Sequence, residues 1–525
     1  MIQRKTQQIS YWRDEYTVSE EDHEYLYETL ADADEPQSLE TLVLGIIRRR
    51  CQLEESRIRS EIERGKVYDP KQKYEVGDDI VFPAFDFRLG KVLAVRPGDN
   101  PEHGEFDVIT VRFENSERER HFAANLQTPH RLNHNGDISL FTSENTLAPE
   151  DILAEVGDVL SAKVEEHLKQ NPDFFVSAGP WWLTADQMVP VNIGHLNIAE
   201  AAIEMKGEPV PTPELLAMVE LDESVPESVR IFSLETALQQ DERFRQVGTL
   251  EQPAWFLTRL MPEAALRIPD PLVYEPVEYD RSLLDVELLQ TEWELNDEHT
   301  DGGLAEEAPP LVSSVFVYLT YPHFISGTLP LPPSAAGLFP KGSGFSTAVT
   351  LIDGRWGHRF TAWVVREGRY IAGLGEWFKS HKLPIGARIT LERTQAPNEI
   401  VVDFKPQRTK REWIRAAYVD EGRLVFQMQR KQLSCDYDDH LALIVPDPDA
   451  VAELSAALRA QGVDVLGLVK QIMPELVKLS PQGTAHVRAL YSAVNVVRRL
   501  PPGPIFAALA SIPEATDTGS GFWSL

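Results

Sequence analysis

An internal repeat is the feature that most constrains how this chain can fold. The segments DFFVSAGPWWLTADQMVP (173–190) and ERFRQVGTLEQPAWFLTRLMP (242–262) share one order: a short strand, a turn, a strand with Trp and Leu, and then Met close to Pro. A segment with helical spacing of apolar residues precedes each copy. We therefore expect at least two units in which a helix leads into a two-stranded hairpin, rather than one continuous core.

The second copy is the fuller one, because three predicted helices precede its hairpin. They cover 198–206, 213–221 and 226–240, and each is opened by Pro or a polar residue. Helices followed by a two-stranded wing resemble the winged-helix domains of the delta subunit of bacterial RNA polymerase and of HARE-type chromatin-associated proteins. The resemblance implies winged-helix units over 148–192, 193–262 and 447–525. The hairpin tryptophans are expected to be core aromatics: Trp181, Trp182, Trp255 and Trp523.

The first 135 residues are expected to form a helical region and a small barrel. Apolar residues at helical spacing predict helices within 1–70, where Ser19 and Asp22 form a capping-box-like start. Over 71–135 the period changes to two, with short strands broken by turns. These strands resemble the small SH3-like barrels of Tudor and KOW proteins. That resemblance implies binding of a protein partner such as RNA polymerase, or of nucleic acid.

Residues 263–311 are rich in Pro and then in acid. The stretch 281–310 holds nine Asp+Glu and one Lys+Arg. This composition predicts a linker with one helix near 283–293. An acidic linker could also shield the basic region that follows it.

Alternation of apolar and polar residues returns over 312–406 and predicts six or seven strands with one short helix near 376–381. The order of elements resembles the plant B-three DNA-binding pseudobarrel, which effector domains of some restriction enzymes also use. The most specific match is the motif at 375–389, in which Trp377 and Phe378 are expected to seal the barrel.

In that family two loops grip the major groove of DNA, and here the equivalent arms are 323–328 and 364–369. On the second arm, Arg366 and Arg369 flank the turn Glu367-Gly368, from which guanidinium groups can reach guanine edges or phosphates. The first arm offers His323, Ser326 and Thr328. Further candidates for phosphate contacts are Lys341, Arg355, Arg359, Lys379 and Lys382. A solvated surface charge is the commoner explanation for any one of these five.

Residues 407–446 are expected to form a basic β extension. A run of cations lies beside Trp413, which suits a phosphate backbone with one stacking group. A buried Trp with solvated neighbours explains the pattern equally well. The cations assigned to DNA here are Arg408, Lys410, Arg411 and Arg415.

The net charge of −31 argues against a nucleic-acid partner for the chain as a uniform body. The charge is unevenly distributed, however. Residues 324–431 hold 17 Lys+Arg against 9 Asp+Glu, whereas the first 323 residues carry −35. This asymmetry favours different partners for the two regions, with DNA on the basic one and protein on the acidic one.

No catalytic motif is evident: the sequence has no phosphate loop, no HExxH and no GxSxG. Glu399, Asp403 and Lys405 imitate one end of a metal-dependent nuclease strand, but the same residues are the expected final strand of the pseudobarrel. His130 and His134 lie in a predicted loop and are not expected to hold a metal. We expect no enzymatic activity, cofactor or metal.

The two cysteines, Cys51 and Cys435, cannot build a disulfide framework or a thiolate zinc site, which favours a reducing cytoplasm. No segment approaches the roughly 20 apolar residues that span a bilayer. The first fifteen residues lack the apolar core of a secretory signal. We therefore expect no membrane partner.

Together these patterns predict a multidomain α+β protein with an SH3-like barrel, tandem winged helices, a seven-stranded pseudobarrel and a C-terminal winged helix. The favoured function is duplex DNA binding in transcription regulation. The alternative is an acidic scaffold that binds RNA polymerase or another factor without touching DNA. A nuclease or restriction-type effector is a third and weaker alternative.

Overall fold

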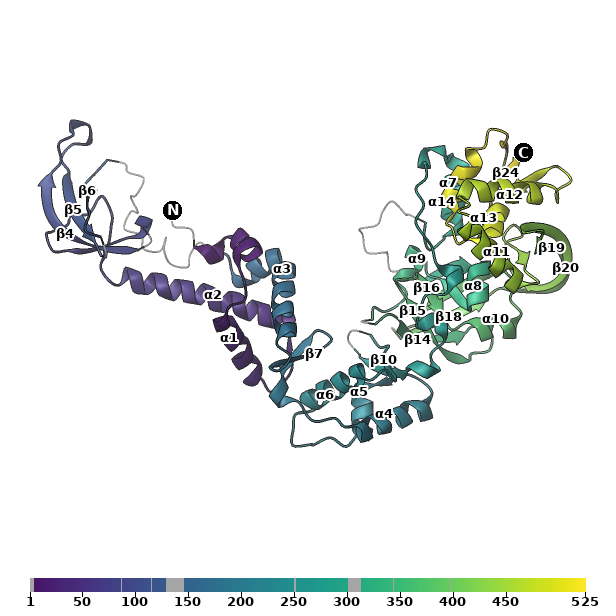
Figure 1. Cartoon of the computed structure of the whole chain (residues 1–525), viewed down its shortest axis with the longest axis horizontal. Helices are drawn as coiled ribbons and strands as arrows, with labels where there is room; N and C mark the ends of the chain where they lie inside the picture. The colour runs from purple at the N-terminus through teal and green to yellow at the C-terminus, as the bar shows by residue number, and fades with distance from the viewer. Residues whose placement is uncertain are drawn as a thin grey trace. The chain divides into compact units, whose positions relative to one another are not determined.

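The computed structural model describes residues 4–85, 87–114, 116–128, 146–249, 252–300, 313–342, 344–396 and 398–525 (Figure 1). The chain forms two compact units. The first contains Met1–Pro190 and Leu221–Thr236, and the second contains Val191–Glu220 and Ala237–Leu525. Helices occur together with several separate sheets, so the expected mixed α+β class is confirmed. His130 and His134 lie outside the described residues.

Three helices form the helical core of the first unit. They are α1 (Glu20–Ala31), α2 (Leu39–Ile62) and α3 (Pro149–Gln170). The expected capping box is present, because the Ser19 side chain accepts a hydrogen bond from the backbone N–H of Asp22. Ser38 caps α2 in the same way. Their apolar stripes share one buried cluster that includes Leu42, Ile46, Val156 and Leu160.

A small three-stranded sheet and a larger five-stranded sheet complete the first unit. The small sheet has the order β1-β8-β7, from β1 (Gln37–Ser38), β7 (Phe175–Ala178) and β8 (Trp181–Thr184). The larger sheet runs in chain order through β2 (Lys66–Val67), β3 (Asp79–Phe82), β4 (Arg88–Pro97), β5 (Asp107–Phe113) and β6 (Glu119–Ala124). At Gly90, a Cβ atom would lie only 2.4 Å from Cγ1 of Val111, so the close packing of β4 on β5 requires glycine.

The second unit begins with the fuller copy of the sequence repeat. Its elements are α4 (Ile193–Lys206), β9 (Val210–Pro211), α5 (Thr212–Met218), β10 (Phe244–Gln246) and β11 (Ala254–Leu257). Helix α6 (Glu227–Gln240) contributes residues to both units. The strands form a sheet of order β10-β11-β9. Trp182, Trp255 and Trp523 are buried as expected, whereas Trp181 is 46% exposed.

A nearly closed seven-stranded sheet forms the centre of the second unit. Its order is β12-β17-β18-β14-β15-β16-β13. The strands are β12 (Ser314–Tyr318), β13 (Thr328–Pro330), β14 (Thr347–Asp353), β15 (Arg359–Val365), β16 (Tyr370–Ala372), β17 (Arg388–Arg393) and β18 (Glu399–Phe404). Short helices α8 (Tyr321–Ser326), α9 (Pro333–Ala336) and α10 (Gly375–His381) accompany it. Trp377 and Phe378 of α10 lie in its apolar core, as expected.

A long hairpin follows the barrel-like sheet. Strands β19 (Pro406–Asp420) and β20 (Arg423–Cys435) pair antiparallel, and β21 (Leu443–Ile444) joins β19 (Figure 1). Residues 406–411 of β19 are exposed, but their partners on β20 include the buried Leu433 and Cys435, so one face of this end of the hairpin is covered. The end of the hairpin formed by 406–413 and 430–435 is called the ribbon below.

Four helices and a small sheet end the chain. They are α11 (Pro448–Ala460), α12 (Val465–Val477), α13 (Val487–Val497), α14 (Pro502–Ala510), β22 (Thr484–His486), β23 (Thr516–Gly519) and β24 (Phe522–Ser524). The sheet order is β22-β24-β23. The helices share a core with Phe426 of β20 and Trp523 of β24.

Residues 263–300, which the composition predicts to be a linker, are a folded part of the second unit. Helix α7 (Val286–Leu295) forms near the expected position. Leu284, Leu288 and Leu295 are buried in the same core as α12, α13 and α14. The linker prediction is wrong for these residues. Their overall composition is acidic, but the apolar side chains of α7 lie on one face of the helix, and that face packs against the core. Residues 301–311 of the predicted linker lie outside the described part of the chain.

Candidate nucleic-acid interface

The first predicted DNA-contacting arm, 323–328, is not an open loop. Most of it belongs to helix α8, and the side chains of His323 and Thr328 are buried. His323 Nδ1 lies 2.8 Å from Thr328 Oγ1, and His323 Nε2 lies 2.9 Å from the Glu298 carboxylate. The hydroxyl of Ser326 is also buried. The expected presentation of these three side chains to a groove is therefore not what the fold produces.

The second predicted arm, 364–369, forms the expected hairpin but packs against other parts of the same unit. Arg366 Nη2 donates to the carbonyl oxygens of Phe339 at 2.8 Å and Pro340 at 3.0 Å. Burial lowers the pKa of Arg366. Arg369 Nη1 donates to the carbonyl oxygen of Glu298 at 2.8 Å. Arg366 is thus engaged within the unit, whereas the Arg369 side chain makes this one hydrogen bond with the described residues and is otherwise exposed.

Tyr370 closes this contact from the next position. Its hydroxyl donates to the carbonyl oxygen of Ala264 at 2.7 Å, so the tip of the hairpin is covered by the segment that follows β11. Gly368 beside it is buried, and an added Cβ would lie 2.2 Å from the Tyr370 ring. The segment predicted to be a linker therefore occupies one side of the second arm.

The two arms do meet, but the space between them is filled by a buried charged network. The Glu298 carboxylate accepts from Arg499 Nε at 3.1 Å, and the neighbouring Asp297 carboxylate accepts from Arg499 Nη2 at 2.8 and 2.7 Å. The Tyr491 hydroxyl also donates to Asp297, at 2.5 Å. Burial alone would raise the pKa of Glu298, but Arg499 and His323 hold it well below its usual range. This network joins the barrel-like sheet to the C-terminal helices.

Three of the five predicted phosphate-contacting residues on the barrel surface are neutralised by carboxylates. The ion pairs are Arg355–Asp403 at 2.5 Å, Arg359–Glu399 at 2.8 Å and Lys379–Glu376 at 2.8 Å. Asp403 and Glu399 are the two acids of the nuclease alternative, and each is engaged by an arginine. Lys341 and Lys382 are exposed and form no ion pair within the described residues.

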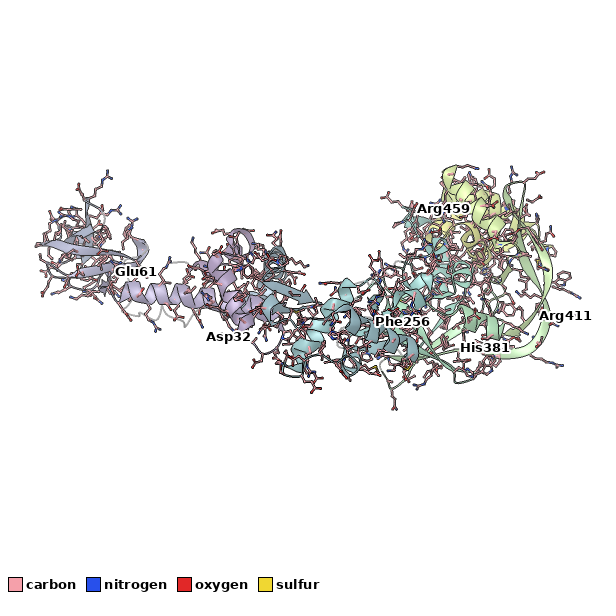
Figure 2. The ribbon with its side chains drawn as sticks, turned by 60° about the horizontal axis from the view of Figure 1, so that its bottom comes forward. Asp32, Glu61, Phe256, His381, Arg411 and Arg459 are labelled. Atoms are coloured by element: carbon pink, nitrogen blue, oxygen red, sulfur yellow. The ribbon has the colours of Figure 1, made fainter. Side chains whose placement is uncertain are left out.

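The ribbon is different, because no carboxylate in the described part of the chain pairs with its cations. Arg408, Lys410 and Arg411 of β19 are exposed, as are Arg430 and Lys431 of β20, and none of the five forms an ion pair with any described residue. Glu412 is the one acid in this part of the ribbon. Figure 2 shows Arg411 on the long hairpin at the edge of the second unit. The sequence analysis identified the cations of β19 and missed those of β20.

The strand pairing assembles these cations into one surface. Trp413 pairs with Arg430, Glu412 with Lys431 and Arg411 with Gln432. Side chains alternate between the two faces of a strand, so Arg411, Trp413 and Arg430 share one face. Trp413 is 57% exposed, and the Arg430 guanidinium lies 5.0 Å from the centre of its ring.

Arg415 is the exception among the predicted residues of this extension. Its Nη2 donates to the carbonyl oxygens of Asp439 at 2.7 Å and His440 at 2.6 Å. It anchors the loop before β21 rather than extending into solvent. The ribbon therefore keeps Arg408, Lys410 and Arg411 as candidates and loses Arg415.

Within the described residues, no group of three or more His, Cys, Asp or Glu side chains is placed to hold a metal ion. None of the helices in the described part of the chain is long and apolar enough to cross a membrane. Comparison with protein-family models, with curated proteins and with solved structures finds no match to this chain. The geometry of the site itself must therefore support any assignment of function.

Proposed function

We propose that this protein binds duplex DNA and that the ribbon is its principal contact. The observation that carries the proposal is the charge of the ribbon: five exposed cations, none of them paired with a described carboxylate, on a two-stranded antiparallel ribbon whose Trp413 face is exposed. The major groove of B-DNA, about 12 Å wide, admits a β-ribbon of two strands. The arms of the barrel-like sheet, whose cations are engaged internally, have a supporting role at most.

The two faces of the ribbon suit two kinds of contact. Arg411 and Arg430 lie on the face that also carries Trp413, where planar guanidinium groups can form paired hydrogen bonds to guanine. Lys410 and Lys431 lie on the opposite face beside the buried Leu433, and burial lowers the pKa of Lys431. Their ammonium groups suit contacts with phosphates at the edge of a groove. The indole of Trp413 adds a stacking surface.

We further propose that the smaller modules belong to the families that their sequences resemble. The five-stranded sheet is assigned as an SH3-like barrel, and the helix–hairpin units as winged helices. The seven-stranded sheet is assigned as a pseudobarrel of the B-three type. The order of elements supports each assignment. Because these modules are found in transcription factors, we place the proposed DNA binding in transcription regulation.

The acidic first part of the chain supports a second role in the same protein. The first 323 residues carry −35, which disfavours DNA and suits a basic protein surface. We propose that this part engages a protein partner such as RNA polymerase while the ribbon engages DNA.

The test compares two triple variants of the full chain for binding to a fluorescent duplex. The ribbon variant is Arg408→Ala, Lys410→Ala and Arg411→Ala. The control variant is Arg355→Ala, Arg359→Ala and Lys379→Ala, which removes the same charge from ion pairs on the barrel surface. We expect the ribbon variant to lose about tenfold or more in affinity, and the control to change little, because contacts to phosphate are lost only in the first.

Two results would contradict the proposal. Equal losses in both variants would show that DNA responds to overall charge rather than to the ribbon. No binding of duplex by the unaltered chain would leave the scaffold alternative, in which the protein binds another protein and no DNA.

A further inference from the structure

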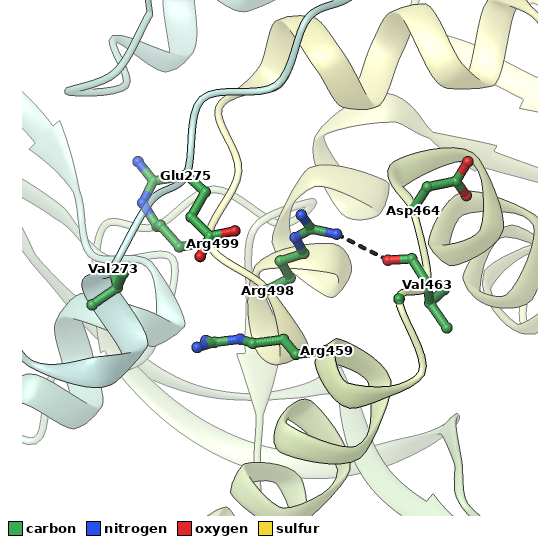
Figure 3. A pocket seen from close by; sticks show the side chains of 8 residues that line it. Val273, Glu275, Arg459, Val463, Asp464, Arg498 and Arg499 are labelled. Carbon is green, nitrogen blue, oxygen red and sulfur yellow. Dashed lines mark hydrogen bonds between the residues drawn. The ribbon is translucent and has the colours of Figure 1, made fainter.

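A cavity of about 390 Å³ lies beside the C-terminal helices of the second unit (Figure 3). Its walls come from the segment 273–275, the end of α11, the loop 462–464 and residues 498–499. Its size lies in the range of sites for small ligands. It shares no lining residue with the ribbon.

Three arginines line this cavity, and two of them have donors left over. Arg499 is fully engaged by Asp297, Glu298 and nearby oxygens. Arg498 donates from Nη1 to the carbonyl oxygen of Val463 at 2.9 Å, the contact marked in Figure 3. Arg459 is exposed, and neither Arg459 nor Arg498 forms an ion pair with a described residue. Two guanidinium groups in one concave wall make a strong site for a phosphate or carboxylate.

Two acceptors lie in the same wall. Glu275 is exposed at the cavity, and Asp464 uses one oxygen to cap α12 by accepting from the N–H of Gly467 at 2.8 Å. Carboxylates repel a simple anion but accept hydrogen bonds from hydroxyl groups. The cavity therefore favours a ligand that carries both an anionic group and hydroxyls.

A second cavity of about 300 Å³ shares the three arginines in its walls. Its other lining includes Tyr321, Val451 and Val496, which are almost fully buried. The same lining includes Asp270, Asp449 and Asn495, so this chamber combines a largely buried aromatic ring and aliphatic side chains with polar groups that can bond to the edge of a base. A planar group with hydrogen-bonding edges, attached to a phosphorylated sugar, matches this pair of chambers.

We propose that the paired cavities bind a nucleotide. Arg459 and Arg498 hold its phosphate, Glu275 accepts from its ribose hydroxyls, and the chamber beside Tyr321 receives its base. This site is independent of the ribbon and adds a small-molecule ligand to the proposed DNA-binding function.

Calorimetric titration of the full chain with adenosine monophosphate, with adenosine and with ribose 5-phosphate tests the proposal. We expect the monophosphate to bind more tightly than either fragment. We expect Arg459→Ala to weaken its binding about tenfold or more, because charge-assisted hydrogen bonds are lost. The Arg459 side chain is exposed and makes no hydrogen bond or ion pair with a described residue, so this variant should fold normally.

Arg411→Ala on the ribbon is the matched control. It should leave binding of the monophosphate unchanged, and Arg459→Ala should leave binding of duplex DNA unchanged. The proposal fails if the monophosphate binds no tighter than adenosine, if Arg459→Ala binds it as well as the unaltered chain does, or if no heat of binding is seen. Loss of DNA binding in Arg459→Ala would instead show that DNA phosphates use these arginines.

Discussion

Arg499 shows how a cation can serve the fold rather than a ligand. Its guanidinium is fully buried and is held by Asp297 and Glu298, from a segment about 200 residues earlier in the chain. Charges buried in this way are tolerated only when they are paired and hydrogen-bonded. The same Glu298 contacts His323 and Arg369. Arg499 therefore stabilises the contact of the segments 323–328 and 364–369 with the C-terminal helices.

We predict that Arg499→Met destabilises the second unit by about 3–5 kcal/mol, because two carboxylates would stay buried without their partner. Chemical denaturation of the full chain measures this change. Arg423→Met, at an exposed position of β20, is the control and should change the free energy of unfolding by no more than about 0.5 kcal/mol. An unaltered unfolding midpoint in Arg499→Met would show that the network contributes no stability.

For Arg366 and Arg369, the sequence predicts the turn that carries them but not the groups that they bind. The turn between them follows from Glu367-Gly368, and the hairpin is present. Their partners do not follow, because Phe339, Pro340 and Glu298 lie 26 to 71 residues away and bind through backbone carbonyls. A backbone oxygen carries no residue-type signature, so no pattern of residue types identifies it as an acceptor.

At the scale of the element, helix α7 explains why an acidic composition was misleading. The helix was expected near its observed position, but its burial was not. Val286 is 81% exposed, whereas Leu288, two positions later, is 2% exposed. A helix of ten residues with one apolar face can be acidic overall and still pack firmly on one side.

We predict that Leu288→Ala destabilises the second unit by about 2–5 kcal/mol, since it opens a cavity in the shared core. Val286→Ala on the same helix removes an exposed side chain and should change the free energy of unfolding by no more than about 0.5 kcal/mol. Thermal unfolding of the two variants compares them directly. Equal unfolding midpoints of the two variants would mean that α7 does not pack against the core and acts as a linker, as its acidic composition suggests.

The ribbon could have been predicted more completely than it was. The turn at Glu421-Gly422 fixes the register of its two strands, so that Trp413 faces Arg430 and Glu412 faces Lys431. Counting outward from this turn would have added the two cations of β20 to those of β19. Counting could not show that no described carboxylate pairs with these cations, whereas the barrel cations Arg355 and Arg359 find carboxylate partners on β18.

At the scale of the whole molecule, net charge and local charge predict opposite responses to salt. A uniform body with a charge of −31 repels DNA, and added salt would screen that repulsion and strengthen binding. A local surface of unpaired cations releases counterions from DNA, and added salt weakens binding. At 0.1 M salt the Debye length is about 10 Å, so the interaction of an exposed charge with groups farther away is largely screened. The local surface should therefore dominate.

We predict that the logarithm of the association constant falls with the logarithm of salt concentration, with a slope of about −3 for the three ribbon cations that are not assigned to guanine. Fluorescence anisotropy of a labelled duplex between about 50 and 200 mM salt measures the slope. Lys410→Gln should make it less steep by about one, since one phosphate contact is lost. A slope near zero, or a positive one, would mean that the acidic remainder of the chain controls the encounter and that the ribbon does not form a phosphate-binding surface.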